Sequence, residues 1–106
     1  MKKYTEIEVA ELSGTLAKNN VLLVDVRNND EVARGVIEGA MHIQLALLPL
    51  ECEKLAKAET VVFYCHSGIR SAHAADFAAT KGITAVNLIG GVVAWAKAGY
   101  ALSPKL

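Results

Sequence analysis

Two short runs of apolar residues constrain the fold of this chain more than any other feature. They are VLLVDV (residues 21–26), which is almost wholly apolar, and TVVFY (60–64). Strands of this kind are expected where both faces of a sheet are covered, as in α/β proteins. TAVNLI (84–89) predicts another strand, and AMHI (40–43) a shorter one.

Helical patterns separate these strands. Helices are expected over about 6–18, where Thr5 and Glu8 fit a capping box, over a short stretch from Asn28 and Glu31 to Gly35, over about 51–58, over about 70–81, and after Gly90-Gly91. Strands joined through helices imply a mainly parallel sheet, because parallel neighbours need crossover connections. We therefore expect a single α/β domain over residues 1–106.

Composition narrows the functional classes. Hydrophobic residues make up 53% of the chain, enough for a real core, and acidic and basic residues balance at 11 each. Nothing in this balance favours a nucleic acid or an anionic membrane as partner. The N-terminal MKKYTEIEVAEL is interrupted by glutamates, and no apolar run is long enough to span a membrane. A cytoplasmic location is expected.

The two cysteines, Cys52 and Cys65, are too few for a disulfide framework. Cys65 and His66 are adjacent, which is not the spacing of zinc ligands. No metal and no cofactor is therefore expected. Cys52 lies in PLECEKL on an expected helix, and we interpret it as a bystander thiol.

Cys65 stands where the 60–64 strand ends and a short loop leads into a helix. Ligands of parallel sheets bind at the carboxyl ends of strands. Gly68 permits a loop whose N–H groups point at sulfur, and the positive end of the following helix adds to their effect. Arg70 supplies a fixed positive charge, and His66 a partial one. These features favour a reactive thiolate and nucleophilic catalysis on Cys65.

Three segments carry a family resemblance. CHSGIRS (65–71) resembles the active-site loop of the rhodanese-like sulfurtransferases. LLVDVRNNDEVARGVIEGAMHI (22–43) resembles their earlier segment, with Asp25, Arg27 and Glu31 at the matching positions, and LIGGVVAWAKAGY (88–100) resembles their late segment. The matches follow in order over nearly the whole chain, and they are to the compact single-domain members.

The resemblance implies a three-layer fold, with a five-stranded parallel sheet between two layers of helices. It also implies a double displacement in which Cys65 takes the outer sulfur of a donor such as thiosulfate as a persulfide. Cyanide or a thiol, including a protein thiol, then accepts that sulfur. By position, the backbone from His66 through Ser67, Gly68 and Ile69 to Arg70 would cradle the persulfide, and Arg70 would attract the anionic donor.

Two departures from the family pattern stand out. Val36 replaces a frequent histidine, for which a local packing consequence is expected. His66 stands where arginine is frequent, which bears on donor preference.

Other functions compete with this one. Phosphatases and arsenate reductases on this architecture have loops resembling C-x-x-x-x-x-R, whereas four residues separate Cys65 from Arg70 here. The shorter loop favours a persulfide, which adds one atom, over a tetrahedral oxyanion, which needs more amides. A non-catalytic binding module commonly lacks the cysteine. A persulfide carrier for a protein partner would use the same chemistry and differ only in its acceptor.

Several further residues have structural interpretations. Arg27 with Glu31 is expected to form an ion pair, and Asp25 to anchor neighbouring turns. Gly90-Gly91 are expected to allow close backbone approach, and Trp95 to pack in the core. Ser67 and Ser71 fit both helix capping and donation to sulfur.

Overall fold

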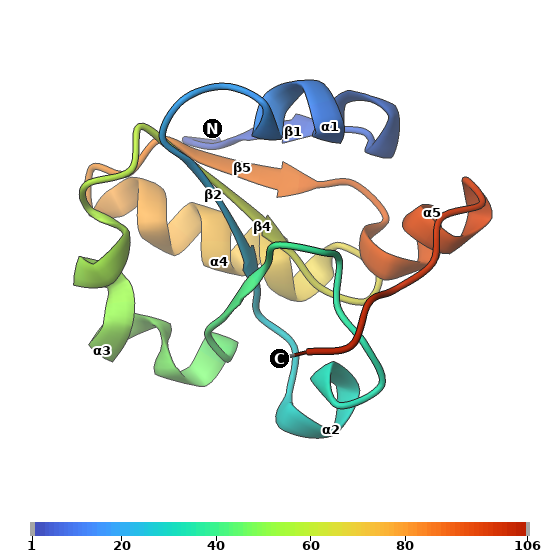
Figure 1. The fold of residues 1–106 in the computed structure, drawn as a ribbon. Coiled ribbons are helices and arrows are strands. Elements are labelled where there is room, and N and C mark those ends of the chain that lie inside the picture. The colour runs from blue at the N-terminus through green and yellow to red at the C-terminus, as the bar shows by residue number, and fades with distance from the viewer. Residues whose placement is uncertain (1, 106) are drawn as a thin grey trace.

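The computed structural model describes residues 2–105, which form a parallel sheet with helices on both faces (Figure 1). The strands are β1 (Thr5–Ile7), β2 (Val21–Asp25), β3 (Met41–His42), β4 (Thr60–Tyr64) and β5 (Ala85–Leu88). Their spatial order is β1-β5-β4-β2-β3, and each neighbouring pair is parallel. The expected five-stranded, three-layer α/β fold is confirmed.

The helices are α1 (Val9–Leu16), α2 (Asn29–Val32), α3 (Leu48–Glu51), α4 (Ile69–Thr80) and α5 (Gly91–Lys97). The helix expected over about 51–58 is wrong in its bounds. In its place α3 begins three residues earlier, with Pro49 in its first turn, and passes into a 3₁₀ helix at Cys52–Leu55. Proline suits a first helical turn because its missing N–H would be unpaired there anyway.

The start of the chain differs from the expectation as well. Thr5–Ile7 is not the opening of a helix but strand β1, which pairs with β5. The capping arrangement lies three residues later, where the Glu8 N–H donates to the Glu11 carboxylate at 3.0 Å. β-branched Thr5 and Ile7 favour a strand, and pairing with β5 decides between the two states.

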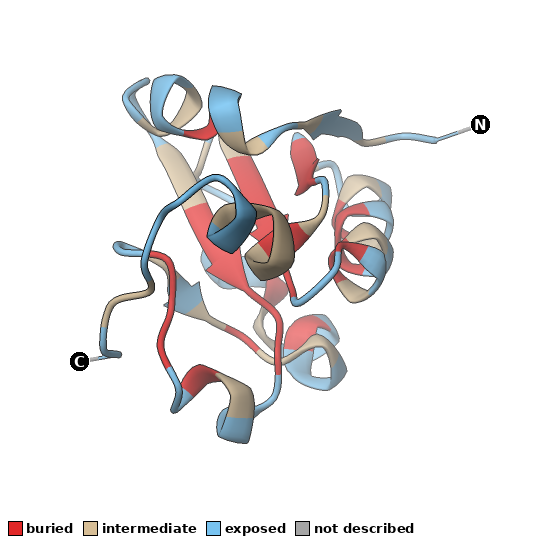
Figure 2. Ribbon diagram, turned by 90° about the vertical axis from the view of Figure 1, so that its right-hand side faces the viewer, coloured by how far each residue is buried: buried red, intermediate tan, exposed pale blue. Residues whose placement is uncertain are grey.

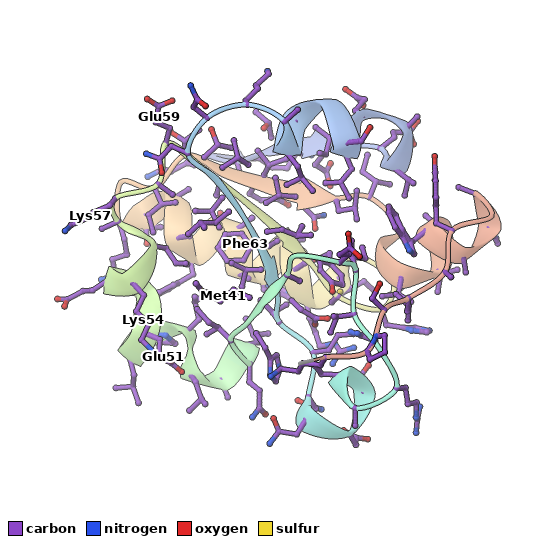
Figure 3. All side chains as sticks on the ribbon, in the orientation of Figure 1. Met41, Glu51, Lys54, Lys57, Glu59 and Phe63 are labelled. Atoms are coloured by element: carbon purple, nitrogen blue, oxygen red, sulfur yellow. The ribbon has the colours of Figure 1, made fainter. Side chains whose placement is uncertain are left out.

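Strand β4 shows why the apolar runs are continuous. Val61 and Phe63 face one hydrophobic cluster, with the alanines of α4, whereas Val62 and Tyr64 face a second, with Leu12 of α1. Figure 2 shows buried residues along the central strands, and Figure 3 shows Phe63 inside the molecule while Lys57 and Glu59 point outward. Both faces of β4 are covered, so the side chains on each face are buried and must be largely apolar.

Helix α4 lies close against the sheet. Its inward positions Ala74, Ala75 and Ala78 are fully buried, and it packs on β4 and β5. Small side chains let the helix approach the strands, which brings its first turn to the carboxyl end of β4. Within residues 2–105, no helix has the length and apolar character needed to cross a membrane.

Candidate active site

Cys65 is the first residue after β4, at the carboxyl end of a central strand. Three donors surround its sulfur: the Gly68 N–H at 3.1 Å, the Ser71 N–H at 3.4 Å and the Ser71 hydroxyl at 3.3 Å. The side chain is only 1% exposed. A buried sulfur that receives three hydrogen bonds is set up to carry negative charge.

Two glycines give the loop this shape. Gly68 has φ +103°, a conformation that strongly favours glycine, and it directly precedes α4. Gly91 approaches the loop from α5, where an added Cβ would lie 2.2 Å from the Cys65 carbonyl oxygen. The expectation of close backbone approach at Gly90-Gly91 is therefore confirmed.

The first turn of α5 fixes which way the loop faces. The Val92 N–H donates to the Cys65 carbonyl and the Val93 N–H to the His66 carbonyl, each at 3.0 Å. These bonds tie the carbonyl oxygens of the loop to α5. The N–H groups that follow are left to turn toward the sulfur.

Burial and hydrogen bonding act in opposite directions on the pKa of the Cys65 thiol. Burial alone raises the pKa of Cys65, but hydrogen bonds from the Ser71 hydroxyl and from backbone N–H groups of Ser71, Gly68 and Ser67 outweigh it and lower the pKa. The positive N-terminal end of α4, a helix of 12 residues, acts in the same direction.

Cys52 shows the contrast. It is buried too, beside a hollow of about 260 Å³ that Lys81 also lines, but burial raises the pKa of this thiol. Since the thiolate is the reactive form, the environment of Cys65 favours nucleophilic chemistry and that of Cys52 does not.

Arg70 lies beside the loop, held by an acidic partner from another element. Its guanidinium donates to both oxygens of Glu31 on α2, at 2.6 and 2.8 Å. This bidentate pair lowers the pKa of Glu31 to about 2. The pair fixes the direction of Arg70 and leaves three of the five guanidinium N–H groups unused by Glu31.

The ion pair expected between Arg27 and Glu31 is therefore wrong. Arg27 is buried and contacts Asp25 instead, with its Nη2 at 2.8 Å from the carboxylate, and it also donates to the Gly35 carbonyl at 2.7 Å. Asp25 in turn accepts the Arg27 backbone N–H at 2.9 Å. The expected anchoring role of Asp25 is confirmed, because its carboxylate binds the turn after β2.

The other loop residues are placed around the sulfur rather than against it. His66 and Ser67 are exposed, and the Ile69 side chain is 69% exposed at the rim. Gly68 is buried and supplies an N–H to the sulfur. Of the five loop residues expected in the site, Gly68 and Ser67 act on the sulfur through their backbone N–H groups. The structure shows no hydrogen bond between the sulfur and His66, Ile69 or Arg70, so their binding roles stay predictions.

Two further polar residues, Ser71 and Asn87, complete the surroundings of the sulfur. Ser71, for which the sequence allows both capping and donation to sulfur, directs its N–H at Cys65, and its hydroxyl lies within hydrogen-bond distance of the same sulfur. Asn87 on β5 was missed; its Oδ1 lies 2.6 Å from the Ser71 hydroxyl. The signal was an asparagine between apolar residues of an expected strand, in AVNLI (85–89), since buried polar side chains require partners.

The sequence of this chain is similar to a known protein family and to individual known proteins. Residues 8–98 match the model of the rhodanese-like domain. A sulfurtransferase of Allochromatium vinosum is 41% identical over 96 residues, covering 89% of this chain and 90% of that protein. The thiosulfate sulfurtransferase GlpE of Coxiella burnetii is 32% identical over 93 residues, 87% of each chain.

The fold of this chain is also similar to that of a solved structure. The crystal structure of a rhodanese-like domain protein from Staphylococcus aureus is 35% identical and aligns with a TM-score of 0.79, covering 86% of this chain and 90% of that one. The matched residues 8–98 include Glu31, Cys65, Arg70 and Asn87.

Proposed function

Because the chain belongs to the family of rhodanese-like domains, we propose that it is a sulfurtransferase that carries sulfur as a persulfide on Cys65. The observation that carries this proposal is the set of three donors that converge on one buried sulfur. They stabilise a thiolate without a dedicated base, and a thiolate is the nucleophile that the reaction requires.

The proposed reaction has two steps. The Cys65 thiolate attacks the outer sulfur of thiosulfate, a sulfur–sulfur bond forms, and the donor's own sulfur–sulfur bond breaks to release sulfite. Cyanide then attacks the outer sulfur of the persulfide and leaves as thiocyanate, which returns the thiolate. The same second step with a thiol acceptor, including one on a partner protein, yields a new persulfide.

Arg70 and the loop backbone are proposed to bind the donor. The N–H groups of Arg70 that Glu31 does not use are available to an anion, and the N–H groups from His66 to Arg70 cradle the sulfur that is transferred. Thiosulfate is named because a relative carries that activity in its name.

Steady-state kinetics test this mechanism. With thiosulfate and cyanide both varied, thiocyanate formation should follow a double displacement, in which reciprocal plots against one substrate stay parallel as the other is changed. Converging lines would contradict a covalent sulfur intermediate. Hydrolysis of an aryl phosphate, with no thiocyanate formed from any sulfane donor, would favour the phosphatase instead.

A further inference from the structure

A buried polar chain runs from the sulfur of Cys65 across the sheet. The Ser71 hydroxyl lies 3.3 Å from Cys65 Sγ and 2.6 Å from Asn87 Oδ1. Ser71 is fully buried and Asn87 is 2% exposed, so these groups satisfy one another and not bulk water. Their hydrogen-bond choices are therefore coupled.

The orientation of the Asn87 amide is fixed by its other neighbours. Its Nδ2 lies 3.1 Å from a carboxylate oxygen of Glu6 on β1 and 3.2 Å from the Gly68 carbonyl oxygen. Both neighbours are acceptors only, so the NH₂ group must face them. Asn87 can offer Ser71 nothing but an acceptor oxygen.

Ser71 therefore stands between two acceptors with a single hydroxyl proton. When Cys65 is a thiol, its S–H can donate to Ser71 Oγ while the hydroxyl donates to Asn87. When Cys65 is a thiolate, the hydroxyl must turn to sulfur and leave Asn87 Oδ1 without its partner. We propose that Asn87 is a positioning residue that competes with Cys65 for the Ser71 proton and thereby limits how stable the thiolate becomes.

This competition has a consequence for turnover, which rests on the proposed function. In the persulfide the negative charge moves to the outer sulfur, and Cys65 Sγ becomes a neutral, weak acceptor. The Ser71 proton then returns to Asn87. Asn87 thus favours the sulfur-loaded enzyme over the free thiolate, and it eases attack on the donor by keeping the nucleophile from excessive stabilisation.

Three ion pairs lie on the elements around this series of hydrogen bonds. Arg70 on α4 is paired with Glu31 on α2, Glu6 on β1 is paired with Lys2, and the buried Asp25–Arg27 pair lies at the end of β2. Among residues 2–105, the Ser71 hydroxyl has hydrogen-bond partners only in Cys65 Sγ and Asn87 Oδ1, so its proton is shared between these two acceptors.

A double-mutant cycle on the pKa of Cys65 tests the competition without any sulfur transfer. The pKa is measured from the ultraviolet absorbance of the thiolate in Cys52→Ser protein, with Ser71→Ala, Asn87→Val and both together. Ser71→Ala should raise the pKa of Cys65 in each background, and by about half a unit or more extra when Asn87 is replaced. Equal shifts, or a smaller shift beside Asn87→Val, would overturn the proposal.

If Asn87→Val does not fold, NMR spectra of protein that retains Asn87 test the same proposal. The side-chain amide signals of Asn87 in NMR spectra should shift with pH at the pKa of the Cys65 thiolate, and Ser71→Ala should remove most of that shift. A pH-dependent shift of the same size in Ser71→Ala would come from the electric field of the thiolate alone. It would contradict the proposed competition for the Ser71 proton. Both readouts are independent of activity, so a failed sulfurtransferase assay leaves them intact.

Discussion

At the scale of single residues, the site depends on which side chains pair. Arg70 is held by Glu31, while Arg27 is taken by Asp25 two positions before it. The two arginines therefore have different partners and different environments. One lies half-exposed beside the loop, and the other is buried beneath the turn that follows β2.

Replacing Arg70 tests its duty as an anion site. Arg70→Ala should raise the KM for thiosulfate roughly tenfold, and the effect should shrink at high ionic strength because salt screens the attraction. Arg34→Ala, which removes an exposed arginine, is the matched control and should leave KM unchanged. An unaltered KM in Arg70→Ala would assign Arg70 to structure alone.

The Arg70–Glu31 pair should also make stability depend on pH. The pKa of Glu31 falls from its ordinary 4.5 to about 2 in the folded protein, so the pair stabilises the fold fully only above the higher value. The difference in unfolding free energy between wild type and Glu31→Gln should be largest at neutral pH. It should shrink as the pH falls from 4.5 toward 2 in urea denaturation series.

Glu59→Gln serves as control for that series, since Glu59 is an exposed carboxylate on another part of the surface. Its difference from wild type should stay flat over the same pH range. A flat profile for Glu31→Gln as well would mean that the ion pair adds nothing to stability.

Removing one partner of the buried Asp25–Arg27 pair should lower the free energy of unfolding more than removing one partner of an exposed ion pair. In Asp25→Ala the buried Arg27 guanidinium loses its carboxylate partner and keeps only the Gly35 carbonyl as a hydrogen-bond acceptor. We expect a loss of about 3–5 kcal/mol in the free energy of unfolding, measured by urea denaturation. A loss below about 1 kcal/mol would show that water reaches Arg27 in the folded state.

At the scale of elements, sequence patterns predicted the strand, loop and helix around Cys65 better than they predicted the start of the chain. The strand at 60–64, the loop and the helix after it follow from a strong apolar run, one glycine and a row of alanines. Thr5–Ile7 was misassigned because three residues carry too weak a pattern to outweigh a capping signal nearby. Partners such as Arg70 and Glu31 lie 39 positions apart, so local sequence rules do not reveal them.

The contact between α5 and the loop gives a prediction at this scale. Gly91→Ala would drive a Cβ into the Cys65 carbonyl and demand φ near +50° of an alanine. We expect a destabilisation of about 1–3 kcal/mol and a marked fall in sulfur transfer, because the loop must shift away from α5.

Gly14→Ala is the control for a glycine in open space. An added Cβ there meets nothing within 4 Å, and Gly14 lies inside α1. This substitution should stabilise the protein by about 0.5–1 kcal/mol in the same denaturation assay. A loss of activity in Gly14→Ala equal to that in Gly91→Ala would remove the link between α5 and the loop.

At the scale of the whole molecule, the sheet order brings the site together. β5 lies between β1 and β4, so Asn87 on β5 binds both Glu6 on β1 and the Gly68 carbonyl of the loop after β4. Sequence periodicity indicated four strands and a parallel sheet; the fifth came only from family resemblance. Strand order depends on which crossovers pack best, and no local pattern encodes that choice.

The mass of the intact protein after incubation with thiosulfate tests the central claim most directly. Wild type and Cys52→Ser should each gain one sulfur atom, Cys65→Ser should gain none, and cyanide should remove the addition. Sulfur found on Cys52, or no addition from any sulfane donor to a normally folded protein, would contradict the account of Cys65 as the sulfur carrier.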